Sequence, residues 1–144
     1  MNQPIPQDNN TRGTMTGIMV TLFSALFATL FFAGFFILAY IKHMPYGRMQ
    51  AMLSQVTAIL FAVVLTQFLS RKIQGDKLTV MQGFLGGWLA SLVLGIFVNT
   101  FYTIFQKITG ANIVPKGAFA MILMLYSAIG VFVSLVFAFI LKKE

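Results

Sequence analysis

Four long apolar tracts constrain this chain more than any other feature of its sequence. They run over about residues 17–41, 49–70, 80–106 and 118–141. Each is close to the roughly 20 residues that an α-helix needs to cross the hydrocarbon core of a bilayer. A lone segment in lipid must satisfy its own backbone hydrogen bonds, and none of the tracts alternates apolar with polar residues as a barrel strand would. The predicted fold class is therefore all-α, an integral membrane four-helix bundle.

Composition excludes a water-soluble fold. Only 9% of the 144 residues are charged, whereas a soluble domain carries roughly 25%. Residues 1–16 are mostly polar and predict a flexible tail, followed by a single transmembrane domain over residues 17–144. The first apolar tract is too long for the core of a cleavable signal peptide, so we interpret it as a span.

Local signals mark where helices begin. Thr79 and Gln82 form a Thr-x-x-Gln capping box, which predicts that the third helix begins directly after Thr79. Pro45 and Pro115 each precede the second helix of a hairpin, and proline is tolerated in a first helical turn.

The distribution of Lys and Arg predicts the orientation. With four spans, both chain ends share one side of the membrane with the middle loop, and that side carries six Lys and Arg against four on the other. Cytoplasmic loops carry the excess of positive charge. We therefore expect both termini in the cytoplasm and the bacterial inner membrane as the location.

The chain shows signs of an internal repeat. A shift of 70 residues places Gly17 on Gly87, Phe31 on Phe101 and Pro45 on Pro115. Each repeat would hold two spans, so both repeats would have the same orientation and an axis along the membrane normal. We expect two tandem helical hairpins. Some transporters contain such repeats, but a duplicated hairpin is also a simple way to make a four-helix bundle.

Small residues recur every four positions on two of the spans and predict close helix packing. Such a spacing traces one ridge along a helix, where small side chains let two backbones approach. The residues are Gly13, Gly17, Thr21 and Ala25 on the first span, and Gly83, Gly87, Ser91 and Gly95 on the third. We interpret both ridges as packing surfaces inside the bundle, with a dimerisation face as the alternative. Two Phe ridges, 23–35 and 97–105, are expected on the opposite faces, toward lipid or a partner.

Reactive groups are missing from the spans. None of the four contains Asp, Glu, Lys, Arg or His, the residues that usually mark proton relays and ion pathways in membranes. This argues against a proton-coupled antiporter, small multidrug exporters in particular. The chain has no Cys, and its single histidine, His43, falls in a loop with no further metal ligand nearby. We expect no catalytic, cofactor-binding or metal-binding residues, no enzyme activity and no nucleic-acid partner.

Three amide side chains are the notable polar groups within the spans. They are Gln55, Gln67 and Asn99. Hydrogen bonds between helices are their natural role, with Asn99 placed on the small ridge of the third span. The alternative is that they line a small polar cavity.

The segment Gly75–Gly87, GDKLTVMQGFLGG, resembles a bacterial family of small four-span membrane proteins classed as a domain of unknown function. In that family a turn glycine is followed by a Leu/Ile-Ser/Thr pair and then by a small residue, Phe and Gly that open the third span. The resemblance implies a four-span architecture over most of the chain. It implies no activity, because the family has no assigned catalytic or binding residues.

These observations lead to a structural or accessory membrane protein as the first hypothesis. Such a protein would act through helix packing with a membrane-protein partner or with itself, within the lipid bilayer. The alternative is a small oligomeric or pseudo-symmetric transporter or channel for a neutral solute. A third hypothesis, an enzyme that uses His43 at headgroup level, has the least support.

Overall fold

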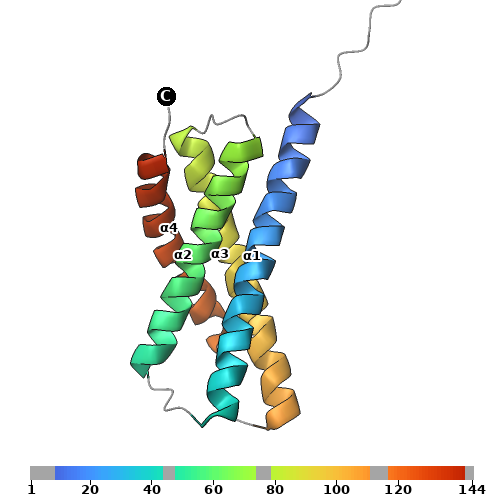
Figure 1. Cartoon of the computed structure of the whole chain (residues 1–144), viewed down its shortest axis with the longest axis vertical. Helices are drawn as coiled ribbons and strands as arrows, with labels where there is room; N and C mark the ends of the chain where they lie inside the picture. The colour runs from blue at the N-terminus through green and yellow to red at the C-terminus, as the bar shows by residue number, and fades with distance from the viewer. Residues whose placement is uncertain (1–8, 44–47, 74–78, 111–116, 142–144) are drawn as a thin grey trace, which may run out of the picture.

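Four helices make up the described part of the chain (Figure 1). The structure is a computed structural model, and it describes residues 9–43, 48–73, 79–110 and 117–141. The helices are α1 (Asn9–Ile41), α2 (Arg48–Ile73), α3 (Val80–Thr109) and α4 (Ala118–Leu141). All four are long and apolar enough to cross a membrane. The predicted all-α four-helix bundle is thereby confirmed.

The capping box at the start of α3 is also confirmed. The Thr79 hydroxyl oxygen accepts a hydrogen bond from the Gln82 backbone N–H at 3.2 Å, and the Gln82 side-chain oxygen accepts one from the Thr79 N–H at 3.3 Å. At the other end Gly110 adopts a left-handed conformation, φ 68°, and its N–H donates to the Gln106 carbonyl. Gly suits this position because it has no Cβ to strain a positive φ.

Helix α1 begins eight residues before the expected start at Gly17. Residues 9–16 are its first two turns, so this half of the expected flexible tail is helical, while residues 1–8 lie outside the described part. A helix that has nucleated in the apolar tract extends cheaply, because each further residue adds a hydrogen bond. Polarity therefore marks where the bilayer ends, while the helix continues beyond it.

The helices form a rhombus with α2 and α3 at its centre. Each central helix contacts the other three helices, whereas α1 and α4 do not contact each other. The N-terminal ends of α1 and α3 lie at the same end of the bundle as the C-terminal ends of α2 and α4 (Figure 1). The predicted repeat would relate the hairpin of α1 and α2 to the hairpin of α3 and α4 by a two-fold axis. Such an axis would turn the α2–α3 contact into a contact between α4 and α1. Because α1 and α4 do not touch, the described helices lack this two-fold symmetry. The internal repeat stays a prediction, and Pro45 and Pro115 lie outside the described residues.

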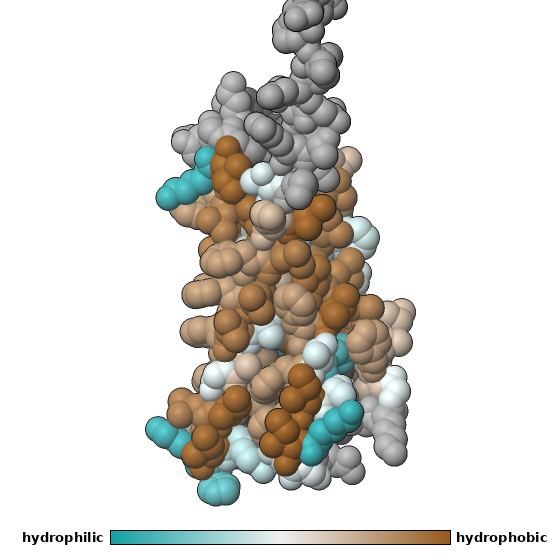
Figure 2. Space-filling view, turned by 90° about the vertical axis from the view of Figure 1, so that its right-hand side faces the viewer, coloured by the Kyte–Doolittle hydropathy of each residue, from teal (hydrophilic) through white to brown (hydrophobic). Residues whose placement is uncertain are grey.

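Large apolar side chains cover the outside of the bundle. Phe31 on α1, Ile96 on α3 and Phe132 on α4 are exposed to between 45% and 71%. Figure 2 shows brown and tan surface over most of one face, with teal residues mainly toward the two ends. Because water would penalise so much exposed apolar area, the surroundings that fit this surface are the acyl chains of a bilayer. The chain is an integral membrane protein.

Candidate functional site

The closest helix contact joins α3 to α4 through small residues. A Cβ built on Gly87 would lie 2.7 Å from the Ser134 Cβ, and one built on Gly95 would lie 3.2 Å from the Tyr126 Cβ. Between these pairs, a Cβ on Gly130 would collide with the Ser91 side chain. Partners advance by four residues on α3 and retreat by four on α4, as expected for two antiparallel ridges. We call these three pairs the α3–α4 ladder.

The third-span ridge predicted from sequence lies on this side of α3. Gly83, Gly87, Ser91 and Gly95 are all buried. On α1 the corresponding ridge is divided: Thr21 and Ala25 are buried in the bundle, whereas Gly17 is exposed with no heavy atom near its Cβ position. The surroundings of Gly13 lie outside the described residues.

Gln67 joins three helices from a fully buried position on α2. Its side-chain nitrogen donates to the Gly83 carbonyl on α3 at 3.0 Å and to the Ser134 carbonyl on α4 at 3.1 Å. Its side-chain oxygen has no hydrogen-bond partner among the described residues. An unsatisfied buried acceptor costs about 1–3 kcal/mol, which offsets much of what the two bonds contribute.

The other two amides lie elsewhere in the bundle. The Gln55 side-chain nitrogen donates to the Tyr102 hydroxyl at 3.4 Å and so connects α2 with α3. Asn99 is buried, but its side-chain nitrogen donates to the Gly95 carbonyl of its own helix at 3.1 Å. The bond expected between helices is thus made within α3, because an Asn side chain can reach the backbone carbonyl one turn earlier in its own helix. Gln55 and Gln67 are about 18 Å apart along α2, so the amides do not converge on one site.

The two Phe ridges differ in their surroundings. On α1, Phe23, Phe27, Phe31 and Phe35 are exposed, as the sequence predicts. On α3, Phe97, Phe101 and Phe105 are half-buried instead and pack against the core, which corrects the expectation that they face away from the bundle. Phe36 of α1 lies edge-on to both Phe101 and Phe105, with ring centroids 5.7 and 5.2 Å apart. The cause is that α3 is a central helix, packed by α4 on its small face and by α1 on its aromatic face.

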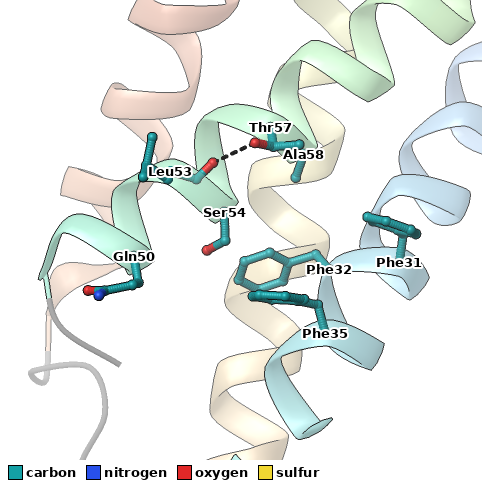
Figure 3. A pocket seen from close by; sticks show the side chains of 8 residues that line it. All are labelled: Phe31, Phe32, Phe35, Gln50, Leu53, Ser54, Thr57 and Ala58. Atoms are coloured by element: carbon teal, nitrogen blue, oxygen red, sulfur yellow. Dashed lines mark hydrogen bonds between the residues drawn. The ribbon is translucent and has the colours of Figure 1, made fainter. Parts of the chain in front are cut away.

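A lateral cleft of about 390 Å³ lies between α1 and α2 (Figure 3). We call it the α1–α2 cleft, and it is lined by Phe31, Phe32, Phe35, Gln50, Leu53, Ser54, Thr57 and Ala58. In the close-up, Phe32 and Phe35 point from α1 toward α2, and Ser54 and Ala58 point back toward them. The sequence reasoning missed this cleft. The available signal was the short run of small residues at Ser54 and Ala58, which leaves space opposite the Phe rings.

The described residues contain no group of three His, Cys, Asp or Glu that could hold a metal ion. His43 is exposed just beyond the end of α1, with φ 49°, and its N–H donates to the Tyr40 carbonyl at 3.2 Å.

Compared with protein-family models, with curated proteins and with solved structures, the chain matches none. The family resemblance of residues 75–87 therefore stays a prediction.

Proposed function

We propose that this chain is a structural or accessory membrane subunit that packs, through an exposed face of α1, against a partner protein or a second copy of itself. The observation that carries the proposal is Gly34. It lies in the interior of α1, is exposed, and has no heavy atom within 4 Å of a Cβ built on it. A glycine inside a helix costs about 1 kcal/mol relative to alanine. It is therefore expected where another helix approaches the backbone closely.

Three glycines inside other spans support this interpretation by contrast. Gly87, Gly95 and Gly130 each contact a neighbouring helix of the same chain, whereas Gly17, at the start of the first span, is open like Gly34. Gly34 has no such neighbour, and a helix from outside the chain would supply one. Phe27, Leu30 and Leu38 lie within about 40° of Gly34 around the helix, and all three are exposed. Together they form a face with a shallow hollow at Gly34, and we call it the Gly34 face.

We infer that the subunit has no catalytic chemistry of its own, in keeping with the lack of Cys in the chain and of Asp, Glu, Lys, Arg and His in the spans. For the transporter alternative, we find no observation that favours it specifically. The three amides that it would use are engaged in bonds to Tyr102 and to backbone carbonyls at separate places. We further propose the bacterial inner membrane as its location, with both termini in the cytoplasm, on the support of the Lys and Arg distribution.

A pair of glycine substitutions tests the proposal. Gly34→Leu fills open space, so we expect the bundle to keep its thermal stability while a stoichiometric partner, or the second copy, is lost. Gly87→Leu would drive a side chain into Ser134 and Val63, so we expect loss of folding. Ala128→Leu adds similar bulk at an exposed position of α4 and serves as the matched control.

The measurement is native mass spectrometry of the full chain, extracted gently from its own membranes, with thermal unfolding measured in parallel. A wild-type chain that emerges as a lone monomer refutes the proposal. So does a Gly34→Leu variant that keeps its partner at wild-type stoichiometry. Loss of the partner in Ala128→Leu as well would show that the effect is not specific to the Gly34 face.

A further inference from the structure

The α1–α2 cleft opens toward the bilayer. Phe31, Phe35 and Leu53 line it and are each exposed to more than 50%, and all three belong to the segments long and apolar enough to cross the membrane. Hydrocarbon rather than water therefore meets the cleft. Its volume of about 390 Å³ falls in the range of about 300–1,000 Å³ that is typical of small-molecule sites.

The walls of the cleft suit an acyl chain. Its surface is almost wholly apolar, with Phe32 and Ala58 as buried parts of the lining. Thr57 adds little polarity, because its hydroxyl donates to the Leu53 carbonyl of the same helix at 2.7 Å (Figure 3). A ligand with many polar groups would lose hydrogen bonds to water here without regaining them.

The charges at this end of the bundle favour an anionic headgroup. Lys42 follows Phe35 by seven residues, which places it about 20° away on the same face of α1 and about two turns nearer the water. Its N–H still bonds the Leu38 carbonyl in the helical pattern, and Lys42 is exposed. Arg48 is the first residue of α2.

The three acids of the chain, Asp8, Asp76 and Glu144, all fall in segments before α1, between α2 and α3, or after α4. Lys42 and Arg48, which lie in the sequence between the end of α1 and the start of α2, thus have no acidic residue in the same connection or in the other connection at that end.

We propose that the α1–α2 cleft binds one acyl chain of an anionic phospholipid, with its phosphate at the level of Lys42. This inference is independent of the Gly34 face. The cleft supplies a fixed groove for the chain, and Lys42 supplies the preference for negative charge. The acyl chain fills the space between α1 and α2.

The first test uses the unmodified chain, delipidated in detergent. A ligand that binds only the folded state raises its stability according to its concentration and affinity. We expect dioleoyl phosphatidylglycerol to raise the thermal midpoint in a saturable manner, and dioleoyl phosphatidylcholine to do so only at higher concentration. Equal responses to the two lipids overturn the headgroup assignment, and no response to either overturns the site.

Two variants and one control variant locate the effect. Ser54→Phe fills the cleft, and we expect it to abolish the midpoint rise, whereas Ala128→Phe adds the same bulk on exposed α4 and keeps it. Lys42→Gln removes one charge, and we expect it to weaken phosphatidylglycerol binding roughly fivefold, as for the loss of one basic residue near a membrane surface. Lys42→Gln is a surface change, so it remains informative even if Ser54→Phe destabilises the fold. A Ser54→Phe variant that folds and still responds to phosphatidylglycerol like wild type overturns the proposal. Native mass spectra of the wild-type chain and of Ser54→Phe give a second check. If Ser54→Phe has lost a bound polypeptide and not a bound phospholipid, the proposal is also overturned.

Discussion

The α3–α4 ladder predicts a large effect from the smallest possible substitution, Gly130→Ala. The added Cβ would lie 2.5 Å from the Ser91 Cβ, against 3.4–4 Å for an ordinary contact. The two helices must then separate by about 1 Å, and a gap of that size forfeits about a quarter to a half of each dispersion contact along the interface. The Gly87–Ser134 and Gly95–Tyr126 contacts loosen with it, because the helices move as rigid bodies. Overpacking of this kind costs about 1–3 kcal/mol.

The chain contains its own reporter for this experiment. Trp88 is its single tryptophan, and its ring nitrogen donates to the Ser127 hydroxyl across the same interface at 3.1 Å. We expect Trp88 fluorescence during an SDS titration of the full chain in detergent to show the destabilisation. Gly34→Ala is the control: the same chemical change in open space should stabilise by about 0.5–1 kcal/mol through helix propensity.

A double substitution isolates the cause. Ser91→Gly removes the atoms that the new Cβ meets, so Ser91→Gly together with Gly130→Ala should recover at least about 1 kcal/mol relative to the sum of the single changes. If Gly130→Ala is as stable as wild type, or if Ser91→Gly fails to rescue it, then the close approach of α3 and α4 is refuted.

Two further expectations concern Gln67 and the orientation. Gln67→Leu removes two hydrogen bonds of about 0.6 kcal/mol each, the average for membrane interiors, but also removes a buried unsatisfied oxygen. We therefore expect the unfolding free energy of Gln67→Leu in SDS to lie within about 1 kcal/mol of the wild-type value. A decrease of more than about 3 kcal/mol would show that the unsatisfied oxygen does not offset the two hydrogen bonds. For orientation, alkaline phosphatase fused after residue 144 should be inactive in bacterial cells and green fluorescent protein fused there should fluoresce; the reverse pattern would place the termini outside.

The sequence predicts the helices well because the physics that sets them is local. The tract over residues 118–141 matches α4 at both ends, and the pairing of Thr79 with Gln82 fixes the start of α3 through groups three residues apart. Bilayer length and backbone hydrogen bonding leave few alternatives for such segments. The start of α1 at Asn9 could not be predicted in this way, because residues 9–16 lie before the apolar tract.

Contacts between helices are harder to predict from one sequence. The spacing of Gly83, Gly87, Ser91 and Gly95 indicates a close-packing face but does not identify the helix that covers it. The aromatic partner of Phe101 depends on α3 having neighbours on two sides, which follows from the rhombus and not from any local pattern. The α1–α2 cleft likewise needs side chains from two helices at once, and only their relative placement reveals the space between them.

The separation of α1 from α4 has a consequence for synthesis and insertion. The first three helices can assemble before α4 leaves the ribosome, because α1 contacts only α2 and α3. During that interval the part of the small face of α3 that α4 later covers, at Ser91 and Gly95, is open to lipid. Because the α4 of a neighbouring nascent chain has the same sequence, it is expected to fit this surface as well as the chain's own α4 does. We therefore expect prompt release of α4 from the translocation machinery to favour a bundle closed on itself over one that exchanges α4 with its neighbour.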